Sequence, residues 1–336
     1  MRSRAAGPRY TRSHMDGTEL FSRCPANPIL TARDLPYAAN TVMNPGAALV
    51  DGETVLLMRV EDRRGISHLT VARSSNGIDG WRIDPKPSFR PAPERHAEEL
   101  WGVEDPRLTW LPELGQWLVV YTAYSRRGPL VALATTSDFR HFERIGPALP
   151  PEDKDAALFG RRIDGCWAML HRPTPVRGNA SIWVSYSPDL RHWGGLSLVL
   201  EAREGAWWDA DKVGLGPPPL ETPEGWLIMY HGVHVTASGS LYRAGLALLD
   251  LEDPRVLRHR TDEWVMSPTE PYERMGDVGG VVFPTGWIHD ETSDELRLYY
   301  GAADTSIGLA TAHLADVLTY LRSCPSPDRP TQAEAR

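Results

Sequence analysis

Cysteine is scarce in this chain of 336 residues, which contains only Cys24, Cys166 and Cys324. An odd number of cysteines at unrelated spacings argues against a disulfide framework and against the paired spacing of a structural zinc site. We therefore expect three reduced thiols, no bound metal ion, and a cytoplasmic location.

Long apolar runs are also missing. No segment approaches the roughly twenty consecutive apolar residues of a membrane-spanning helix. The basic N-terminal stretch MRSRAAGPRYTRSH contains no apolar core of the length that a secretory signal needs. The net charge of −8 argues against a nucleic-acid-binding surface. The expected partners are therefore small molecules, with self-association left open.

Helical patterns are rare as well, and the clearest one is ADVLTYLRS at residues 315–323. The chain is instead rich in short runs of β-branched, aliphatic and aromatic residues, each ending in polar or charged residues. Five such runs are predicted to be the inner strands of five repeated units: TVLLMRVED (54–62), QWLVVYTAYS (116–125), CWAMLHRP (166–173), GWLIMYHGV (225–233) and ELRLYYGAAD (295–304).

Three polar turns share a signature that ends in an aromatic residue: SSNGIDGW (74–81), TSDFRHF (136–142) and SPDLRHW (187–193). Repetition of strand-period segments at a spacing of roughly fifty to sixty residues is typical of a β-propeller. The sequence therefore predicts an all-β fold, a five-bladed β-propeller with the active site at its axial mouth. We expect a partly flexible N-terminal extension at 1–26, the propeller at 27–323 and a disordered tail at 324–336.

Aromatic residues next to charges suggest a carbohydrate site. Trp101 precedes Glu104 and Asp105, and Trp207 and Trp208 precede an acidic run. Sugar C–H faces pack on aromatic rings, while sugar hydroxyls take charged hydrogen-bond partners. The alternative is that these tryptophans only fill space between blades.

The most distinctive local motif is WGVEDPR, at residues 101–107. The residue before a proline is restricted to extended or turn geometry, which would fix the direction of Asp105. The alternative is a simple turn in which Glu104 or Asp105 pairs with Arg107.

Taken together and in order, several segments resemble glycoside hydrolase family 130, the β-mannoside phosphorylases and their hydrolytic relatives. The similarity runs from about Asn27 to Leu321. It rests on VMNPGAALV, LLMRVED, WGVEDPR, VVYTAYS, TSDFRHFERIG, EDKDAALF, MLHRP, SYSPDLRHW, WWDADKVGLGPPPLETPEGWLIMYHGV, YRAGLALLDLEDP and LYYGAADTSIGLA. This resemblance implies inverting chemistry at a mannosyl anomeric carbon, with inorganic phosphate as co-substrate and no cofactor.

The resemblance also implies roles for individual residues. Asp105 would be the catalytic acid, delivering its proton through the 3-hydroxyl of the bound mannose. The substrate-binding positions would be Asn44, Arg59, Glu104 and Asp304. The phosphate-binding positions would be Lys154, Arg172, Lys212, His231 and Tyr242. One departure is LFGRR at 158–162, where relatives commonly carry an LFPEK-like run.

The residue types distinguish two reactions. An inverting hydrolase needs a carboxylic acid and a carboxylate base roughly 6.5–9.5 Å apart. A phosphorylase needs the acid and a cluster of cations for its anionic nucleophile. His231 could instead be satisfied by the backbone, and Lys212 could simply pair with Asp209 and Asp211.

Three functions therefore remain open at this stage. The first is phosphorolysis of a β-mannoside, such as β-mannobiose or a manno-oligosaccharide, to α-mannose 1-phosphate. The second is an inverting β-mannosidase with Glu273 or Asp209 as the base. The third is a non-catalytic sugar-binding propeller, which the intact EDPR disfavours. The linkage and the leaving sugar depend on loops that carry no portable pattern.

Overall fold

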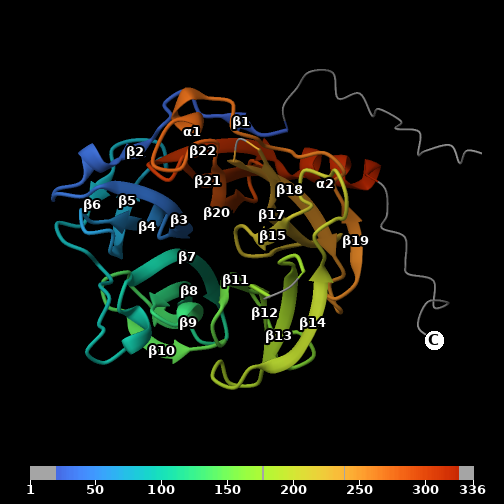
Figure 1. Cartoon of the computed structure of the whole chain (residues 1–336), viewed down its shortest axis with the longest axis horizontal. Helices are drawn as coiled ribbons and strands as arrows, with labels where there is room; N and C mark the ends of the chain where they lie inside the picture. Colours follow the sequence, from blue (N-terminus) through green and yellow to red (C-terminus); the bar gives the residue numbers. More distant parts are fainter. Residues whose placement is uncertain (1–19, 176–177, 238, 325–336) are drawn as a thin grey trace, which may run out of the picture.

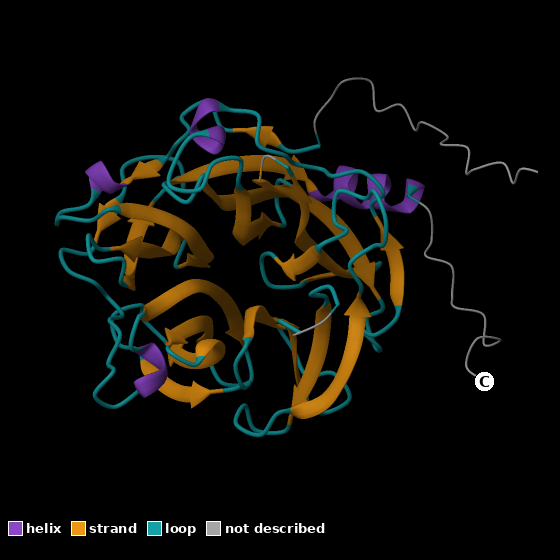
Figure 2. Cartoon of the chain, viewed as in Figure 1, coloured by secondary structure: helices purple, strands orange, loops and turns teal. Residues whose placement is uncertain are grey.

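The computed structural model describes residues 20–175, 178–237 and 239–324, and strands dominate it (Figure 2). The predicted all-β class is confirmed. The described residues contain two α-helices, α1 (Pro271–Arg274) and α2 (Leu314–Ser323), and two 3₁₀ helices (Ala32–Asp34 and Ala97–Glu99). Helix α2 confirms the helix that the sequence predicted over 315–323. None of the described helices is long and apolar enough to cross a membrane.

The strands form five antiparallel units in chain order (Figure 1). Unit 1 contains β3 (Thr41–Val50), β4 (Glu53–Glu61), β5 (Ser67–Ser74) and β6 (Arg82–Ile83). Unit 2 contains β7 (Gly102–Leu111), β8 (Gln116–Ser125), β9 (Gly128–Thr136) and β10 (Glu143–Pro147). Unit 3 contains β11 (Asp153–Leu158), β12 (Trp167–Pro173), β13 (Ile182–Ser187) and β14 (Gly194–Leu200). One parallel bridge, between Ser67 and Gly102, joins units 1 and 2.

The last two units complete the chain. Unit 4 contains β15 (Lys212–Leu215), β16 (Leu220–Thr222), β17 (Gly225–Thr236), β18 (Gly239–Leu249) and β19 (Leu257–Arg260). Unit 5 contains β20 (Val282–Asp290), β21 (Glu295–Ala302) and β22 (Ser306–His313), with β1 (Ser22–Arg23) and β2 (Leu30–Thr31) both paired to β22. Chain segments from both ends of the described sequence therefore meet in one sheet.

The described part of the predicted N-terminal extension belongs to the packed structure. Phe21 is buried in the core, and Ser22 and Arg23 pair with β22. Residues 1–19 of the extension and residues 325–336 of the predicted tail lie outside the described residues.

The five predicted runs are all strands, namely β4, β8, β12, β17 and β21. Their expected place as inner strands is wrong, because each is the second strand of its unit. The first strands make the cross-unit contacts: β3 contacts β7 and β20, and β11 contacts β7 and β15. Side chains that meet at the centre of the molecule must therefore come mainly from first strands.

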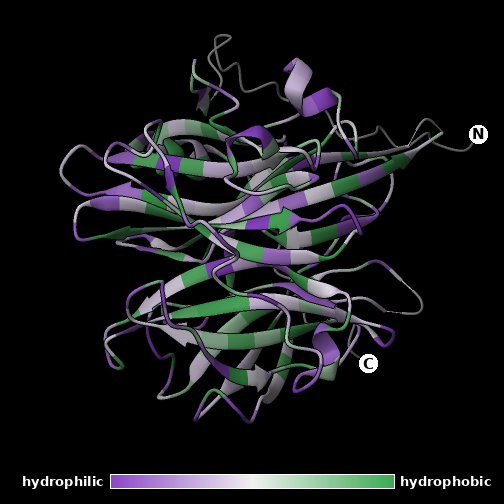
Figure 3. Cartoon of the chain, turned by 90° about the vertical axis from the view of Figure 1, so that its left-hand side faces the viewer, coloured by the Kyte–Doolittle hydropathy of each residue, from purple (hydrophilic) through white to green (hydrophobic). Residues whose placement is uncertain are grey.

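Among the described residues, the apolar core is divided into five clusters, each between two units. Units 1 and 2, 2 and 3, 3 and 4, and 4 and 5 share one cluster each, and a fifth cluster joins unit 5 to unit 1. Sheets covered on both faces need continuous apolar strands, which explains runs such as VLLM in β4. In the side view of Figure 3, hydrophobic segments lie mainly along the strands.

Candidate functional site

The site is built on three β-bulges. The first strands of units 1, 2 and 3 shift register next to Asn44, Asp105 and Asp155 respectively. These residues have φ values of 46°, 48° and 52°, in the left-handed region that Asn and Asp tolerate better than most residues. A bulge re-aims a side chain. All three side chains are buried.

Asp105 lies in a cluster with Asn44 and Arg59. Asn44 Nδ2 donates a hydrogen bond of 2.8 Å to Asp105 Oδ1, and Arg59 Nη1 donates one of 3.1 Å to the same oxygen. The other terminal nitrogen of Arg59, Nη2, lies 3.2 Å from Glu104 Oε1. Gly301 leaves room for this cluster, because a Cβ there would overlap the Asn44 side-chain oxygen. Arg59, from the second strand of unit 1, thus holds two carboxylates of unit 2.

Arg107 does not pair with the carboxylates of its own motif. Its Nη1 donates to the main-chain oxygen of Asp105 at 2.8 Å, while Nε and Nη2 donate to the main-chain oxygens of Gly216 and Leu215. The simple-turn alternative for EDPR is therefore wrong. Arg107 therefore stabilises the main chain at the bulge, while Arg59 and Asn44 bind the Asp105 carboxylate.

Three carboxylates share this region and titrate differently. Burial alone would raise the pKa of Asp105, but the Arg59 charge, with Lys154 and Arg107, outweighs it and lowers that pKa. Burial raises the pKa of Glu104. Burial and the adjacent Asp105 charge raise the pKa of Asp304 to about 6. Asp105 is thus the most acidic of the three.

A second cluster surrounds the carboxylate of Asp155, which is fully buried. Arg172 approaches Asp155 Oδ2 with both Nε and Nη2, each at 2.8 Å. His231 Nε2 lies 3.6 Å from the same oxygen, and Arg107 Nη2 lies 3.9 Å from Oδ1. Although burial opposes ionisation, Arg172 and Lys154 hold the pKa of Asp155 far below its usual range.

Lys212 and Tyr242 extend this cluster from unit 4. Lys212 Nζ donates to the Tyr242 hydroxyl at 2.8 Å, and the His231 and Tyr242 rings are 5.9 Å apart. The alternative pairing of Lys212 with acidic neighbours is wrong, because Asp211 contacts His234 and Asp209 contacts Arg260. Burial, with nearby cations, lowers the pKa of His231 to about 3, so its ring is neutral. Nδ1 of that ring is buried without a hydrogen-bond partner among the described residues, so a backbone contact does not satisfy it.

The predicted site residues therefore fall into two adjoining groups. The substrate group contains Asn44, Arg59, Glu104, Asp105 and Asp304, and the phosphate group contains Arg172, Lys212, His231 and Tyr242. Lys154 connects the two, because its charge acts on Glu104, Asp105 and Asp304 and also on Asp155.

The tryptophans and the LFGRR segment noted in the sequence lie outside the two groups. Trp208 is buried and stacks on Tyr230, with ring centroids 5.6 Å apart, so its expected role as a sugar platform is wrong. Trp101 is different, because 41% of it is exposed and it packs edge-on against Tyr124. In the LFGRR segment, Arg161 pairs with Glu221 and Arg162 pairs with Glu113.

Asp155 is the main residue that sequence reasoning missed. Its signal was the similarity of Lys154-Asp155-Ala156 to Glu104-Asp105-Pro106, since both place a charged residue and an aspartate at the start of a first strand. Pro106 makes the first of these motifs distinctive in the sequence, whereas the second has alanine at the corresponding position.

A family model described as beta-1,4-mannooligosaccharide phosphorylase matches residues 23–323. The chain belongs to glycoside hydrolase family 130. The beta-1,4-mannooligosaccharide phosphorylase of Ruminococcus albus is 32% identical over 92% of both chains. The beta-1,2-mannobiose phosphorylase of Listeria innocua is 38% identical over 76% of this chain and 69% of its own length.

Solved structures agree with this family 130 assignment. The Listeria innocua beta-1,2-mannobiose phosphorylase in complex with beta-1,2-mannobiose has a TM-score of 0.80 and 31% identity, over 90% of this chain and 99% of its own. A further structure comes from work on family 130 members that include glycoside hydrolases targeting beta-1,2 mannosidic linkages in Candida mannan. It has a TM-score of 0.78 and 27% identity, over 94% of this chain and 98% of its own.

Proposed function

We propose that this family 130 enzyme is an inverting β-mannoside phosphorylase, a hexosyltransferase. It cleaves a β-mannobiose or manno-oligosaccharide with inorganic phosphate and gives α-mannose 1-phosphate, reversibly. Asp105 is the catalytic acid, acting through the mannose 3-hydroxyl. Asn44, Arg59, Glu104 and Asp304 bind the mannosyl residue.

The observation that carries this proposal is the group of cations beside the Asp105 cluster. The charges of Arg172 and Lys212, from two different units, act on neutral His231, and Lys212 also donates to the Tyr242 hydroxyl. Lys154 acts on the adjacent Asp155. Asp155 pairs with Arg172 and offsets only one of these positive charges, so the remaining cations and donors favour a further anion. Phosphate supplies that charge and accepts several charge-assisted hydrogen bonds. The attacking group is then already anionic and requires no carboxylate base.

Hydrolysis is the second candidate, because family 130 includes hydrolases. The two carboxylates considered as its base are engaged elsewhere. Glu273 accepts hydrogen bonds from Arg23 at 2.7 Å and from Tyr300 at 2.9 Å, and Asp209 accepts one from Arg260 at 2.7 Å. Within the described residues, no hydrogen bond or ion pair joins either one to the Asp105 cluster. This arrangement favours phosphorolysis.

The protonation of Asp105 is coupled to phosphate in this scheme. A catalytic acid must carry a proton, yet Arg59 and Lys154 lower the pKa of Asp105 in the free protein. A phosphate anion beside Lys154 offsets part of that positive charge. Binding of phosphate therefore raises the pKa of Asp105 and favours its acid form.

We also propose that the five units are the blades of a five-bladed β-propeller, with the site at its axial mouth. The five clusters of apolar residues between successive units, the last joining unit 5 to unit 1, support this arrangement. First strands would then line the axis, which agrees with their bulges supplying Asn44, Asp105 and Asp155. The three free cysteines favour a cytoplasmic location.

The reaction is tested by its products. Purified protein is incubated with β-1,2- and β-1,4-mannobiose, with and without inorganic phosphate, and the products are identified by NMR. We expect α-mannose 1-phosphate only when phosphate is present. Free mannose released at the same rate without phosphate would identify a hydrolase, and no product with either disaccharide, phosphate or not, would contradict the proposal.

A matched pair of variants then tests the anion site. Arg172→Ala removes a planar donor fork from the phosphate group, so the KM for phosphate should rise by about tenfold or more while the KM for the mannoside changes little. Arg161→Ala removes an arginine whose partners, Glu221 and Glu252, are on the surface, and should leave both constants unchanged.

A further inference from the structure

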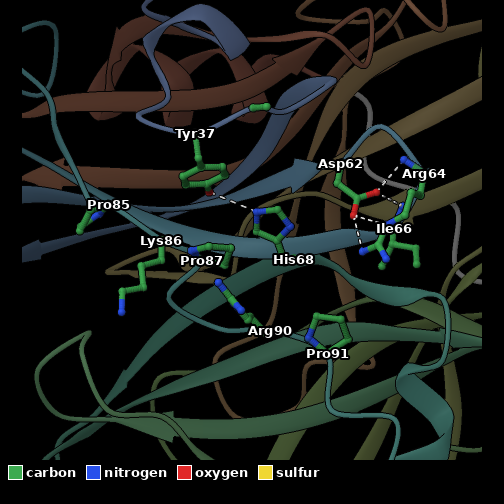
Figure 4. Close-up of a pocket in the computed structure, with 11 residues that line it drawn as sticks. Tyr37, Asp62, Arg64, Ile66, His68, Pro85, Lys86, Pro87, Arg90 and Pro91 are labelled. Carbon is green, nitrogen blue, oxygen red and sulfur yellow. Dashed lines mark hydrogen bonds and ion pairs between the residues drawn. The ribbon is translucent and has the colours of Figure 1, made fainter.

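A pocket of about 560 Å³ lies at the outer edge of unit 1 (Figure 4). The segment before β3 and the β4–β5 turn form two of its walls, and the segment after β6 forms the third. Its volume is within the range of small-molecule sites. The lining residues that carry polar groups are Tyr37, Asp62, Arg64, His68, Lys86 and Arg90.

One wall of the pocket is a hydrogen-bonded group. The hydroxyl of Tyr37 lies 3.1 Å from His68 Nε2 and also contacts the Thr70 hydroxyl. Thr70 is fully buried, and only 8% of His68 is exposed. The other ring nitrogen of His68 has no hydrogen-bond partner among the described residues, although His68 lines the pocket.

The opposite wall is cationic. Arg64 pairs with Asp62 at 2.7 Å, but no ion pair to Lys86 or Arg90 occurs in the described part of the chain. In Figure 4, His68 lies between Tyr37 and Arg90. Burial lowers the pKa of His68, the Asp62 charge opposes this shift, and the Arg90 charge adds to it. Lys86 and Arg90, two cations without a carboxylate partner in the described residues, therefore line the pocket together with His68.

The pocket is separate from the Asp105 cluster. Ser67 accepts a hydrogen bond of 3.0 Å from Arg59 Nε, so its side chain is on the same face of the sheet as the site. His68 is the next residue along β5, and successive side chains of a strand point to opposite faces. The sheet of unit 1 thus lies between the pocket and the Asp105 cluster.

We infer that this pocket binds a phosphorylated sugar. Its phosphate would contact Lys86, Arg90 and the free nitrogen of His68, and its ring would pack against Tyr37 and the neighbouring prolines. Charge-assisted hydrogen bonds supply the attraction, and the aromatic ring offers a surface for sugar C–H groups. This inference does not depend on the proposed reaction.

Calorimetric titration with α-mannose 1-phosphate tests the inference on the intact protein. Wild type and Arg95→Ala, an exposed arginine of the same segment that does not line the pocket, should each bind at two sites. In the double variant Lys86→Ala/Arg90→Ala, the affinity of the second site should fall by about tenfold or more, so that only one site is detected. If the proposed reaction is wrong, wild type should show one site that the double variant loses.

A spectroscopic measurement locates the second site. The His68 ring signal should titrate at higher pH when α-mannose 1-phosphate is bound, because an added anion favours imidazolium. Mannose should leave the His68 titration unchanged. Equal affinity for inorganic phosphate would overturn the sugar part of the inference. The inference as a whole would be overturned by an unaltered His68 titration, or by equal stoichiometry in the double variant and wild type.

Discussion

Asp155 Oδ2 lies 2.8 Å from both Nε and Nη2 of Arg172, and both side chains are buried. This pair holds the guanidinium in place behind the proposed phosphate position. A carboxylate in a site for an anion would oppose binding if it touched the ligand. Here it instead lies among Arg172, Arg107 and His231, where it offsets part of the positive charge of the two arginines.

Asp155→Asn should therefore destabilise the fold. The variant leaves Arg172 and Arg107 buried without their counter-charge, and breaking such a pair costs about 3–5 kcal/mol. Urea unfolding measures the loss. Asp164→Asn is the matched control, because Asp164 has a φ of 47° but is exposed. The free energy of unfolding of this variant should equal that of wild type. Equal stability of the two variants would contradict the role of Asp155.

Asp105→Asn should remove on the order of 10²-fold or more of the activity, because asparagine cannot donate the proton. The fold should persist, since asparagine tolerates a φ of 48° and can still accept the hydrogen bond from Asn44. Activity and thermal unfolding are measured together. The exposed Asp51, with a φ of 50°, provides the control Asp51→Asn. Near wild-type turnover in a folded Asp105→Asn protein would end the assignment.

Asp304 should make stability depend on pH. Its pKa is about 6 in the folded protein, against 3.8 ordinarily, so the folded state binds the proton more tightly than the unfolded state. Stability therefore falls as the pH rises from about 4 to about 6 and then levels off, with a loss on the order of 3 kcal/mol. Asp304→Asn should lack this loss. Unfolding of both proteins across this range checks the sign, and parallel curves would refute it.

Trp101→Ala should weaken binding of the mannoside. The ring is exposed beside Tyr124 and precedes Glu104 by three residues, which suits stacking against the leaving sugar. Loss of such a contact costs on the order of 1 kcal/mol, or about fivefold in the KM for the mannoside. The KM for phosphate should not change. Trp110→Ala, equally exposed at the other end of β7, should alter neither constant.

Chelation should leave the activity intact. In the proposed reaction, lysine and arginine side chains hold the phosphate, so no metal ion is needed for that task. Turnover is compared before and after dialysis against excess EDTA. A loss that calcium or zinc restores would reveal an ion that the proposal omits.

Most of the fold was accessible from the sequence. Apolar runs predicted β4, β8, β12, β17 and β21, since strand formation depends on local side chains and on burial of both faces. The position of these strands within each unit could not be predicted, because neighbouring strands in a meander have similar composition. The roles of the buried Trp208 and of Asp155 were missed for a related reason. A ring or a carboxylate looks the same in sequence whether it faces solvent, a ligand or the core.

The sequence by itself determined the motifs and the repeated strand pattern, because these depend on side-chain type and short-range backbone preference. The tertiary structure decided which groups pair. Arg59 reaches Asp105 across 46 positions of the chain, and Arg107 turns away from the carboxylates of its own motif. Adjacent residues also have different roles, since Asp155 binds Arg172 while the charge of Lys154 acts on both groups of the site. Such choices follow from packing between units, where the sign and distance of every neighbouring charge act together.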